Sequence, residues 1–511
     1  MRATLAAAAT GVLAAGAAVS VALASAIPLG EPANPITSVG SLVIDLAPPA
    51  IKDTVIALFG TGDKPFLIAV LLVLLTGAAA VAGVLELMRR GTGMLLLAGV
   101  AAVAAGAVAT RSGSSPTDLL PTILGAIAGA FVLRTGARRL RDWRSAAPGT
   151  SAAAVDRRKF LQLLGVAAAG AAILSVGSAA VRQLSNGIEA IRTTLGLPRP
   201  ADPSPPIPDG ADLDVPGITP YVTPNESFYR IDTALLVPNV DPADWTLRIN
   251  GMVEREIELT FDELLAKPLV ERALTLTCVS NVVGGDLVGN AVWLGYPVRE
   301  LLAEAVPLAG ADMVLSRSVD GFTAGTPLEA LQDPDRLSLI AIGMNGEPLP
   351  LEHGFPVRMV VSGLYGYVSA TKWLTELTVT RFADAEGYWT PRGWSARGPI
   401  KLASRIDTPR PGGTVPSPVV IAGVAWAQNT GIEKVEVRVD DGPWQTATLA
   451  GTVSADTWRQ WSLEWDAQPG EHTLTVRATD ADGTVQTSLE APPAPDGASG
   501  HHSVTVQVRG G

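Results

Sequence analysis

Long apolar stretches dominate the first third of the chain. Five of them can be read, at residues 3–27, 66–88, 94–110, 119–136 and 160–184. Most approach the length of about 20 residues that a helix needs to cross the hydrocarbon core of a bilayer. The pattern predicts a membrane region over residues 1–185 with about five transmembrane helices.

Positive charge falls on one side of this predicted bundle. Arg89 and Arg90 lie between the second and third stretches. A larger group lies between the fourth and fifth: Arg138, Arg139, Arg141, Arg144, Arg157, Arg158 and Lys159. Because Lys and Arg collect in cytoplasmic loops, both loops are predicted to be cytoplasmic. The sequence therefore predicts a multi-pass protein of the cell membrane. With five helices, everything after about residue 185 would lie on the extracytoplasmic side.

The fifth stretch opens with a pair of arginines, in the sequence DRRKFL at residues 156–161. This resembles the twin-arginine signal of proteins that fold before export. The alternative is ordinary positive flanking of a membrane helix. If the signal is used, the domain beyond it is assembled in the cytoplasm, together with any cofactor.

Beyond residue 185 the pattern changes three times. Residues 195–220 contain eight prolines, which predict an extended, semi-rigid spacer within a linker at 186–220. Short apolar segments punctuated by Gly and Pro then predict an α+β domain over 221–405. These segments are 245–249, 261–265, 274–278, 298–303, 313–318, 337–342, 357–361 and 374–379.

From residue 406 the pattern is that of β-strands only. The predicted strands are 419–426, 435–439, 461–465, 473–478 and 504–508. Their alternation and turn spacing favour an immunoglobulin-like β-sandwich over 406–511. Five tryptophans of this region are read mainly as packing residues rather than as a binding surface: Trp426, Trp444, Trp458, Trp461 and Trp465.

Composition and charge narrow the chemistry. The chain has 511 residues, 47% of them hydrophobic, and a net charge of −11, so it lacks the basic surface of a nucleic-acid-binding protein. One cysteine excludes intramolecular disulfides, iron–sulfur sites held by several cysteines and four-cysteine zinc sites. No histidine precedes His353, so the predicted helices cannot hold a haem between two imidazoles. Glu86 is the main charge within the helices, which favours anchoring or partner docking over ion transport.

Five motifs in the soluble half resemble, in order, the sulfite oxidase family of molybdopterin enzymes. They are PNESFY at 224–229, LTCVSN at 276–281, WLGYPV at 293–298, HGFPVR at 353–358 and the segment 366–374. The resemblance covers more than half of the chain. It implies a molybdopterin-binding catalytic domain over 221–405, followed by a dimerisation-type sandwich and hence a candidate homodimer.

The resemblance also implies site residues. Cys278 would ligate the metal of a molybdenum–molybdopterin cofactor and Tyr388 would assist at the metal. The residues that would hold the cofactor are Asn225, Phe228, Tyr229, Ser318, His353, Arg358, Ser369, Ala370, Thr371 and Lys372.

The chemistry of these side chains agrees with that assignment. A thiolate suits a soft metal. The guanidinium of Arg358, the ammonium of Lys372 and a flexible backbone nest at 369–371 suit a phosphate. Cys278 could instead be an inert buried thiol, Tyr388 a buried structural tyrosine and Lys372 an ordinary surface residue.

One departure from the family concerns the substrate. Where sulfite oxidases have arginines after the cysteine motif, this chain has Val282 and Val283. An anion there would lack charge-assisted donors, which favours a small uncharged sulfur or nitrogen compound over sulfite. The predicted activity is two-electron oxygen-atom transfer.

Two further points concern the electron-transfer partner and a competing interpretation of the chain. Without a haem domain or iron–sulfur cysteines, electrons must be exchanged with a separate partner, and a membrane cytochrome is the candidate. The competing interpretation is a non-enzymatic, membrane-anchored adhesion or binding module on a degenerate molybdopterin scaffold.

Overall fold

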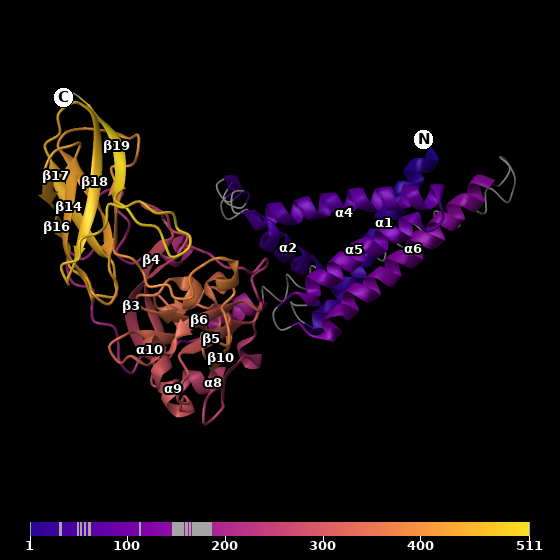
Figure 1. Ribbon diagram of the computed structural model, residues 1–511, viewed down its shortest axis with the longest axis horizontal. Helices are drawn as coiled ribbons and strands as arrows, with labels where there is room; N and C mark the ends of the chain where they lie inside the picture. Colours follow the sequence, from indigo (N-terminus) through magenta and orange to yellow (C-terminus); the bar gives the residue numbers. More distant parts are fainter. Residues whose placement is uncertain are drawn as a thin grey trace. The chain divides into compact units, whose positions relative to one another are not determined.

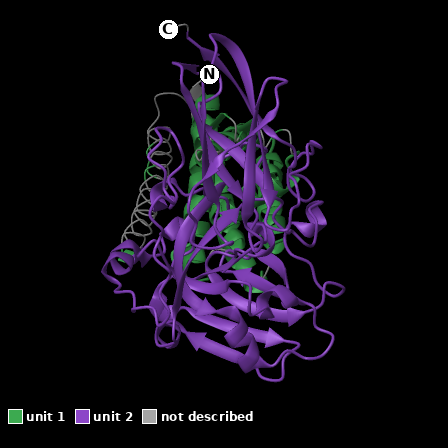
Figure 2. Cartoon of the chain, turned by 90° about the vertical axis from the view of Figure 1, so that its left-hand side faces the viewer, with its two compact units in different colours: residues 1–187, 233–239 green, residues 188–232, 240–511 purple. Residues whose placement is uncertain are grey.

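The computed structural model describes residues 2–145 and 187–509, together with the single residues 158, 162 and 165. Within the first range, residues 30–32, 49–50, 52–53, 56–57, 60–62 and 112–113 are not described. The described chain forms two compact units. Unit 1 contains Met1–Gly187 and Thr233–Asn239, and unit 2 contains Ile188–Asp232 and Val240–Gly511 (Figure 2). Each unit is described separately below.

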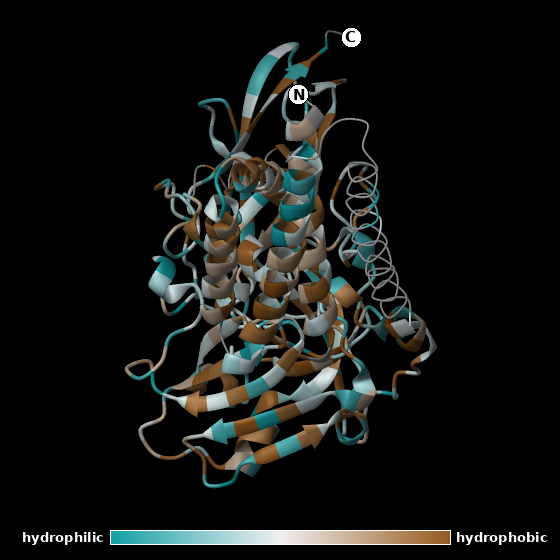
Figure 3. Cartoon of the chain, turned by 90° about the vertical axis from the view of Figure 1, so that its right-hand side faces the viewer, coloured by the Kyte–Doolittle hydropathy of each residue, from teal (hydrophilic) through white to brown (hydrophobic). Residues whose placement is uncertain are grey.

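Unit 1 is helical (Figure 1). Its elements are α1 (Arg2–Ala26), η1 (Ile27–Leu29), α2 (Pro35–Leu46), α4 (Asp63–Met88), α5 (Thr92–Ala109), η4 (Pro116–Leu119) and α6 (Leu120–Ser145). Four helical segments among the described residues are long and apolar enough to cross a membrane: Ala3–Ala26, Lys64–Met88, Thr92–Ala109 and Pro116–Ser145. Hydrophobic residues, brown in Figure 3, recur along the helices of unit 1. The fifth predicted span, 160–184, lies outside the described residues except for 162 and 165.

Small residues let these helices approach closely. A Cβ added at Gly11 of α1 would collide with the carbonyl oxygen of Ala79 in α4, and one at Gly125 of α6 would collide with the carbonyl oxygen of Ala18 in α1. Small residues at such contacts are typical of helices packed within a membrane, where backbone proximity replaces the hydrophobic effect as the source of packing energy.

Glu86 closes the turn between α4 and α5. Its carboxylate is buried and accepts hydrogen bonds from the amide of Gly91, at 3.0 Å from each carboxylate oxygen, and from the amide of Met94 at 3.2 Å. Arg141 of α6 donates to the Glu86 carbonyl at 2.7 Å. These contacts satisfy amide groups at the start of α5, which otherwise lack partners. Glu86 therefore has a structural role in this helical unit.

The mixed domain of unit 2 is built on two five-stranded sheets. One has the order β2–β1–β10–β5–β6, with β1 and β10 parallel. The other has the order β3–β4–β7–β8, with β9 also paired to β7. Three short helices, α8 (Phe261–Leu265), α9 (Val298–Ala305) and α10 (Leu328–Gln332), complete the domain. The strands are β1 (Thr246–Gly251), β2 (Ile257–Thr260), β3 (Val270–Thr277), β4 (Val288–Pro297), β5 (Met313–Ser318), β6 (Thr323–Pro327), β7 (Ser338–Met344), β8 (Glu347–Pro348), β9 (Arg358–Val361) and β10 (Leu374–Thr380).

The C-terminal region is a β-sandwich, as predicted. One sheet has the order β11–β13–β17–β16 and the other β12–β19–β18–β14–β15. The strands are β11 (Ala403–Thr408), β12 (Thr414–Val415), β13 (Val419–Trp426), β14 (Ile432–Val439), β15 (Trp444–Thr446), β16 (Thr448–Leu449), β17 (Arg459–Trp465), β18 (Gly470–Asp480) and β19 (His502–Val508). Trp426, Trp458 and Trp461 are buried, so these three pack inside the protein.

The Pro-rich segment is docked along unit 2 rather than free. Ala201 donates its amide to Leu269 of the mixed domain at 2.8 Å, and Leu213 donates to the side chain of Gln460 in the sandwich at 2.6 Å. The indole of Trp458 donates to the Tyr221 carbonyl at 2.8 Å. The predicted spacer is therefore packed against both domains of unit 2 at these residues and is not a free linker there. Proline removes amide donors but leaves carbonyls and side chains free to bind a surface.

Candidate active site

Cys278 lies directly after β3, where the chain turns toward β4. Its amide donates to Leu287 at 2.9 Å, and its carbonyl accepts from Asn281 at 3.0 Å. The residue is 8% exposed. Burial raises the pKa of the thiol, while the amide and hydroxyl of Ser280 and the charge of Lys372 act in the opposite direction. The strand end thus presents a buried sulfur whose thiolate form has nearby donors and a nearby cation.

Two tyrosines lie close enough to Cys278 for its charge to affect them. Burial raises the pKa of Tyr229, and the charge of Cys278 raises it further. Burial also raises the pKa of Tyr365 to about 12, and Cys278 adds to the shift. Tyr365 was not predicted as a site residue, although it immediately precedes the motif that begins at Gly366. The fold brings the loop after β9, which contains Tyr365, beside the end of β3, and no local sequence signal indicates this proximity.

A positively charged corner lies next to this sulfur. Arg358 is 4% exposed and donates to the carbonyls of His353 at 3.1 Å and Ala370 at 3.4 Å. Lys372, 8% exposed, forms an ion pair with Asp232 at 3.1 Å. Arg230 shares that carboxylate at 3.0 Å. Among the described residues Arg358 has no carboxylate partner, so the corner carries more positive than negative charge.

Burial makes this arrangement costly without an anion. It lowers the pKa of Arg358 to about 10 and that of Lys372 to about 8. Removing a charge from water is expensive unless an opposite charge and hydrogen bonds compensate. A phosphate group would provide both at this position.

His353 is held as a neutral imidazole. It is 2% exposed, and its Nε2 lies 3.2 Å from the carbonyl oxygen of Asn225, so Nε2 must carry the proton. Nδ1 is then an acceptor, and it has no hydrogen-bond partner among the described residues. In this tautomer the free ring nitrogen cannot donate to a phosphate. Its free nitrogen fits a donor on a bound molecule instead.

Acid should destabilise the protein through His353. Burial, with help from Lys372 and Arg358, lowers its pKa to about 3. Between about pH 6.5 and that value the unfolded chain binds a proton that the native protein does not, so stability falls as pH falls, by up to about 1.4 kcal/mol per pH unit. We expect His353→Gln to flatten this slope in thermal unfolding of the detergent-solubilised protein between pH 4.5 and 7.5.

His472 supplies a control of opposite sign. A hydrogen bond from His472 to Asp440 raises the pKa of this histidine. Its contribution is therefore present below its unfolded pKa and is lost as pH rises through the higher folded pKa. His472→Gln should leave the acid-side slope in place. An unchanged slope in the His353→Gln protein would contradict the proposed burial effect.

The other predicted cofactor residues differ in whether their polar groups already have hydrogen-bond partners. The hydroxyl of Ser318, at the end of β5, is buried without a partner among the described residues. Thr371 hydrogen-bonds to Ser316 at 2.7 Å. The amides of Ser369 and Ala370 both donate to the Gly366 carbonyl, at 3.3 and 2.9 Å. The expected flexible backbone nest at 369–371 was therefore wrong for these two amides, which already close a helical turn.

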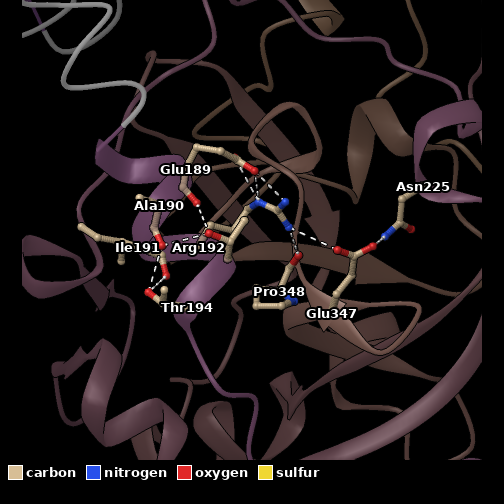
Figure 4. A network of polar contacts seen from close by, with 9 residues as sticks. Glu189, Ala190, Ile191, Arg192, Thr194, Asn225, Glu347 and Pro348 are labelled. Carbon is tan, nitrogen blue, oxygen red and sulfur yellow. Dashed lines mark hydrogen bonds and ion pairs between the residues drawn. The ribbon is translucent and has the colours of Figure 1, made fainter.

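Asn225 belongs to a polar network that Figure 4 shows. Its side-chain nitrogen donates to Glu347 at 2.8 Å, as Figure 4 shows. Its side-chain oxygen accepts from Asn345 at 2.8 Å. Glu347 also pairs with Arg192 at 3.4 Å, and Arg192 pairs with Glu189 at 2.7 Å. The network joins the helical residues 187–194 to the predicted cofactor segment. The Asn225 side chain thus orders its own segment.

Aromatic packing completes this wall. The ring of Phe228 is buried and lies 5.2 Å from the ring of Tyr229, 5.6 Å from His353 and 5.9 Å from Trp293, measured between centroids. The guanidinium of Arg358 lies over the Trp293 ring at 5.1 Å. Rigid aromatic contacts of this kind hold the surrounding polar groups in place.

Tyr388 lies in another setting. Its ring is 3.7 Å from the guanidinium carbon of Arg392 and 5.2 Å from the ring of Trp389. Its amide donates to Thr323 at 2.9 Å. The tyrosines whose pKa values Cys278 affects are Tyr229 and Tyr365. The role of Tyr388 at a metal stays a prediction from the resemblance.

The donor set fits a metal that arrives with its own ligands. Among the described residues no group of three or more His, Cys, Asp or Glu side chains could hold a metal ion. One buried cysteine, unpartnered polar atoms on Ser318 and His353, and the positive corner lie in the same domain. A metal bound through sulfur atoms of an organic cofactor that also bears a phosphate matches these features.

Known proteins resemble the soluble half in sequence. Residues 234–389 match the oxidoreductase molybdopterin-binding domain family, and residues 403–476 match a bacterial Ig domain family. Human mitochondrial sulfite oxidase is 31% identical over 323 residues, covering 53% of this chain and 58% of the human protein. An NADH nitrate reductase of Phaseolus vulgaris is 27% identical over 309 residues, covering 48% and 34% of the two chains.

The match is partial in length. The chain spans about 58% of the human sulfite oxidase that it resembles. Among solved structures, the sulfane dehydrogenase SoxCD of Paracoccus pantotrophus is 23% identical, with a TM-score of 0.48, and the match covers 57% of this chain and 84% of that one. The sequence matches to the molybdopterin domain identify molybdenum–molybdopterin as the cofactor. The chain therefore carries an oxidoreductase molybdopterin-binding domain at residues 234–389 and is similar to sulfite oxidases over about half of its length.

Proposed function

We propose that this chain is a membrane-anchored enzyme that transfers an oxygen atom to or from a small, uncharged sulfur or nitrogen compound. The observation that carries the proposal is the buried Cys278 beside a corner of unbalanced positive charge. For a sulfoxide or N-oxide, the oxygen would leave as water after uptake of two electrons and two protons. When bound, the cofactor supplies the metal at which this oxygen is exchanged.

The residues around Cys278 would hold the thiolate that binds the metal. The amide and hydroxyl of Ser280 and the charge of Lys372 favour the deprotonated sulfur, and burial protects it from water. Arg358 and Lys372 would bind the terminal phosphate, with Arg230 and Asp232 fixing the ammonium. The Nδ1 of His353 and the hydroxyl of Ser318 would meet polar groups of the pterin.

The surface after the cysteine supports an uncharged substrate. Val282 is 56% exposed, so an apolar side chain stands at the solvent edge three positions before Gly285. Sulfite would meet no charge-assisted donor from this residue or from Val283. A sulfoxide or N-oxide needs fewer such donors because it carries no net charge.

Location and electron transfer complete the proposal. Four membrane-length helices support a membrane anchor. The arginines at 89–90 and 138–158, read as cytoplasmic, would place the catalytic part on the extracytoplasmic side if the expected fifth span at 160–184 also crosses the membrane. The arginine pair Arg157 and Arg158 supports export of the folded domain. With one cysteine and four histidines in the chain, electrons would come from a separate one-electron carrier, for which a membrane cytochrome is the candidate.

Metal analysis of the purified full chain tests the proposal. Expression in a host that makes the cofactor should yield about one molybdenum per chain, and turnover of dimethyl sulfoxide or trimethylamine N-oxide with an artificial electron donor. Stable, folded protein without molybdenum from such a host would refute the enzyme. Saturable turnover of sulfite in preference to these oxides would refute the uncharged substrate.

A further inference from the structure

The strand that leads to Cys278 has an outer edge that the sandwich covers. β3 is the edge strand of its sheet and pairs on one side with β4. On its other side the amide of Thr275 donates to the carbonyl of Asp456 at 3.0 Å, and the carbonyl of Thr275 accepts from the side chain of Gln428 at 3.2 Å. Asp456 lies in the sandwich loop between β16 and β17. The sandwich thus satisfies buried backbone groups three residues before the cysteine.

The side chain of Asp456 bonds to a second part of the site. Its carboxylate accepts from the hydroxyl of Ser362 at 2.5 Å and from the amide of Asn429. Ser362 is fully buried and directly follows β9, the strand that begins with Arg358. Burial raises the pKa of Asp456, while the two hydrogen bonds and the charge of Arg336 act in the opposite direction. A carboxylate buried in this way needs its donors, so these contacts fix its place.

The turn after Ser362 leads into the predicted cofactor segment. Gly363 has a φ of +73°, and a Cβ there would collide with the side-chain nitrogen of Asn429. The segment begins at Gly366, where an added Cβ would lie 3.9 Å from the carbonyl oxygen of Thr277. The cofactor segment therefore faces the end of β3, next to the cysteine.

We propose that Asp456 is a positioning residue that sets the spacing between the cysteine strand and the cofactor segment. Its backbone carbonyl holds β3 at Thr275, and its carboxylate holds the end of β9 at Ser362. One residue of the sandwich thereby joins the two parts of the mixed domain between which the cofactor would bind. The inference rests on the proposed function, because it takes Cys278 as the ligand of the cofactor metal.

The alternative is that Asp456 only holds the two domains of unit 2 together. Its loss would then lower the stability of the whole protein, and Cys278 would react with a thiol reagent only as often as the chain unfolds. A positioning role predicts local loosening instead. Cys278, which is 8% exposed, would then become reactive without unfolding of the protein.

The test measures the rate at which a thiol reagent modifies Cys278 under native conditions. It uses the full-length, detergent-solubilised chain from a host that does not make the cofactor. We expect Asp456→Ala to react about tenfold faster than wild type, which is the effect of about one hydrogen bond on a local opening equilibrium. Asp456→Asn keeps an oxygen that can accept from Ser362, and its rate should stay within about threefold of wild type.

The adjacent Thr457 gives a matched control in the same loop. Its buried hydroxyl bonds to Tyr221 and Thr452, at 2.8 Å each, rather than to Ser362. Thr457→Val should lower the unfolding temperature and yet leave the rate of thiol modification within about twofold of wild type. Equal acceleration in Thr457→Val and Asp456→Ala, or no acceleration in Asp456→Ala, would overturn the inference.

Ser362→Ala removes the same hydrogen bond from its other end. It should also accelerate modification of Cys278 about tenfold, and it decides the question if Asp456→Ala does not fold. Because the two side chains act through one contact, the double variant should react no faster than either single variant. An unchanged rate in Ser362→Ala would contradict the proposed positioning.

Turnover of the holoenzyme gives a second readout. Asp456→Ala should lower kcat for dimethyl sulfoxide about tenfold and leave KM within about twofold, because a small displacement of the site slows the reaction more than it weakens substrate binding. Asp456→Asn should restore most of kcat. Absence of molybdenum from the wild-type protein would count against the proposed function alone, and the rates of thiol modification would still decide whether Asp456 positions the site.

Discussion

Replacing Cys278 by serine should abolish turnover, by on the order of 10³-fold or more. The hydroxyl of serine is far less acidic than a thiol and does not bind a soft metal as a thiolate does. Molybdenum content should fall in parallel when it is measured by mass spectrometry on purified protein. Thermal unfolding of the cofactor-free chain should change little, by about 1 kcal/mol, since the substitution preserves side-chain size.

The neighbouring Thr277 offers a matched control. Thr277→Ser changes a buried side chain one position away and keeps its hydroxyl. It should retain molybdenum and most of the activity. If Cys278→Ser kept both its metal and its turnover, the sulfur would have no role in holding the cofactor, and the alternative of an inert buried thiol would be correct.

Replacing Arg358 by methionine should have effects of opposite sign on the loaded and the empty protein. Hydrogen bonds to a charged group contribute about 1.5–3 kcal/mol each, so losing the guanidinium should weaken cofactor retention about 100-fold or more. The empty protein, however, loses a buried charge that has no carboxylate partner among the described residues. Its unfolding temperature should stay the same or rise.

Both quantities can be measured on one preparation. Cofactor retention follows from molybdenum and pterin content after dialysis, and stability from thermal unfolding of cofactor-free protein. Arg317→Met is the control, because Arg317 is partly exposed and pairs with the carboxylate of Glu376 at 3.1 Å. A large loss of stability in empty Arg358→Met would show that the guanidinium mainly supports the fold.

Much of the architecture could be predicted because it follows local patterns. The four helices of membrane-spanning length are long and largely apolar, and the strands at 313–318 and 419–426 begin and end where the pattern placed them. The strand Val288–Pro297 was recognised only as part of a motif, because Gly289, Asn290 and Gly295 interrupt its apolar pattern. Pairing on both edges, with β3 and β7, defines this strand, and no local signal encodes that pairing.

The motif residues of the site could be predicted from the sequence, but the residues that form ion pairs with them could not. Cys278, His353, Arg358 and Lys372 stand in short sequence motifs. Asp232 pairs with Lys372 across 140 positions, and Asp496 pairs with Lys401 across 95. Such contacts depend on how separate segments fold together. The motif residues could therefore be predicted from the resemblance, whereas their ion-pair partners became known only from the fold.

The burial of the sole cysteine gives a direct way to distinguish folded from unfolded chains. A thiol reagent added to the native protein should meet almost no accessible sulfur, whereas denaturation in the presence of a chelator exposes one thiol per chain. Any second cysteine placed on the surface would therefore accept a spectroscopic label without competition. Labels on the sandwich loop at 496–500 and on the docked segment at 201–213 would then report loop movement and linker release in the working enzyme.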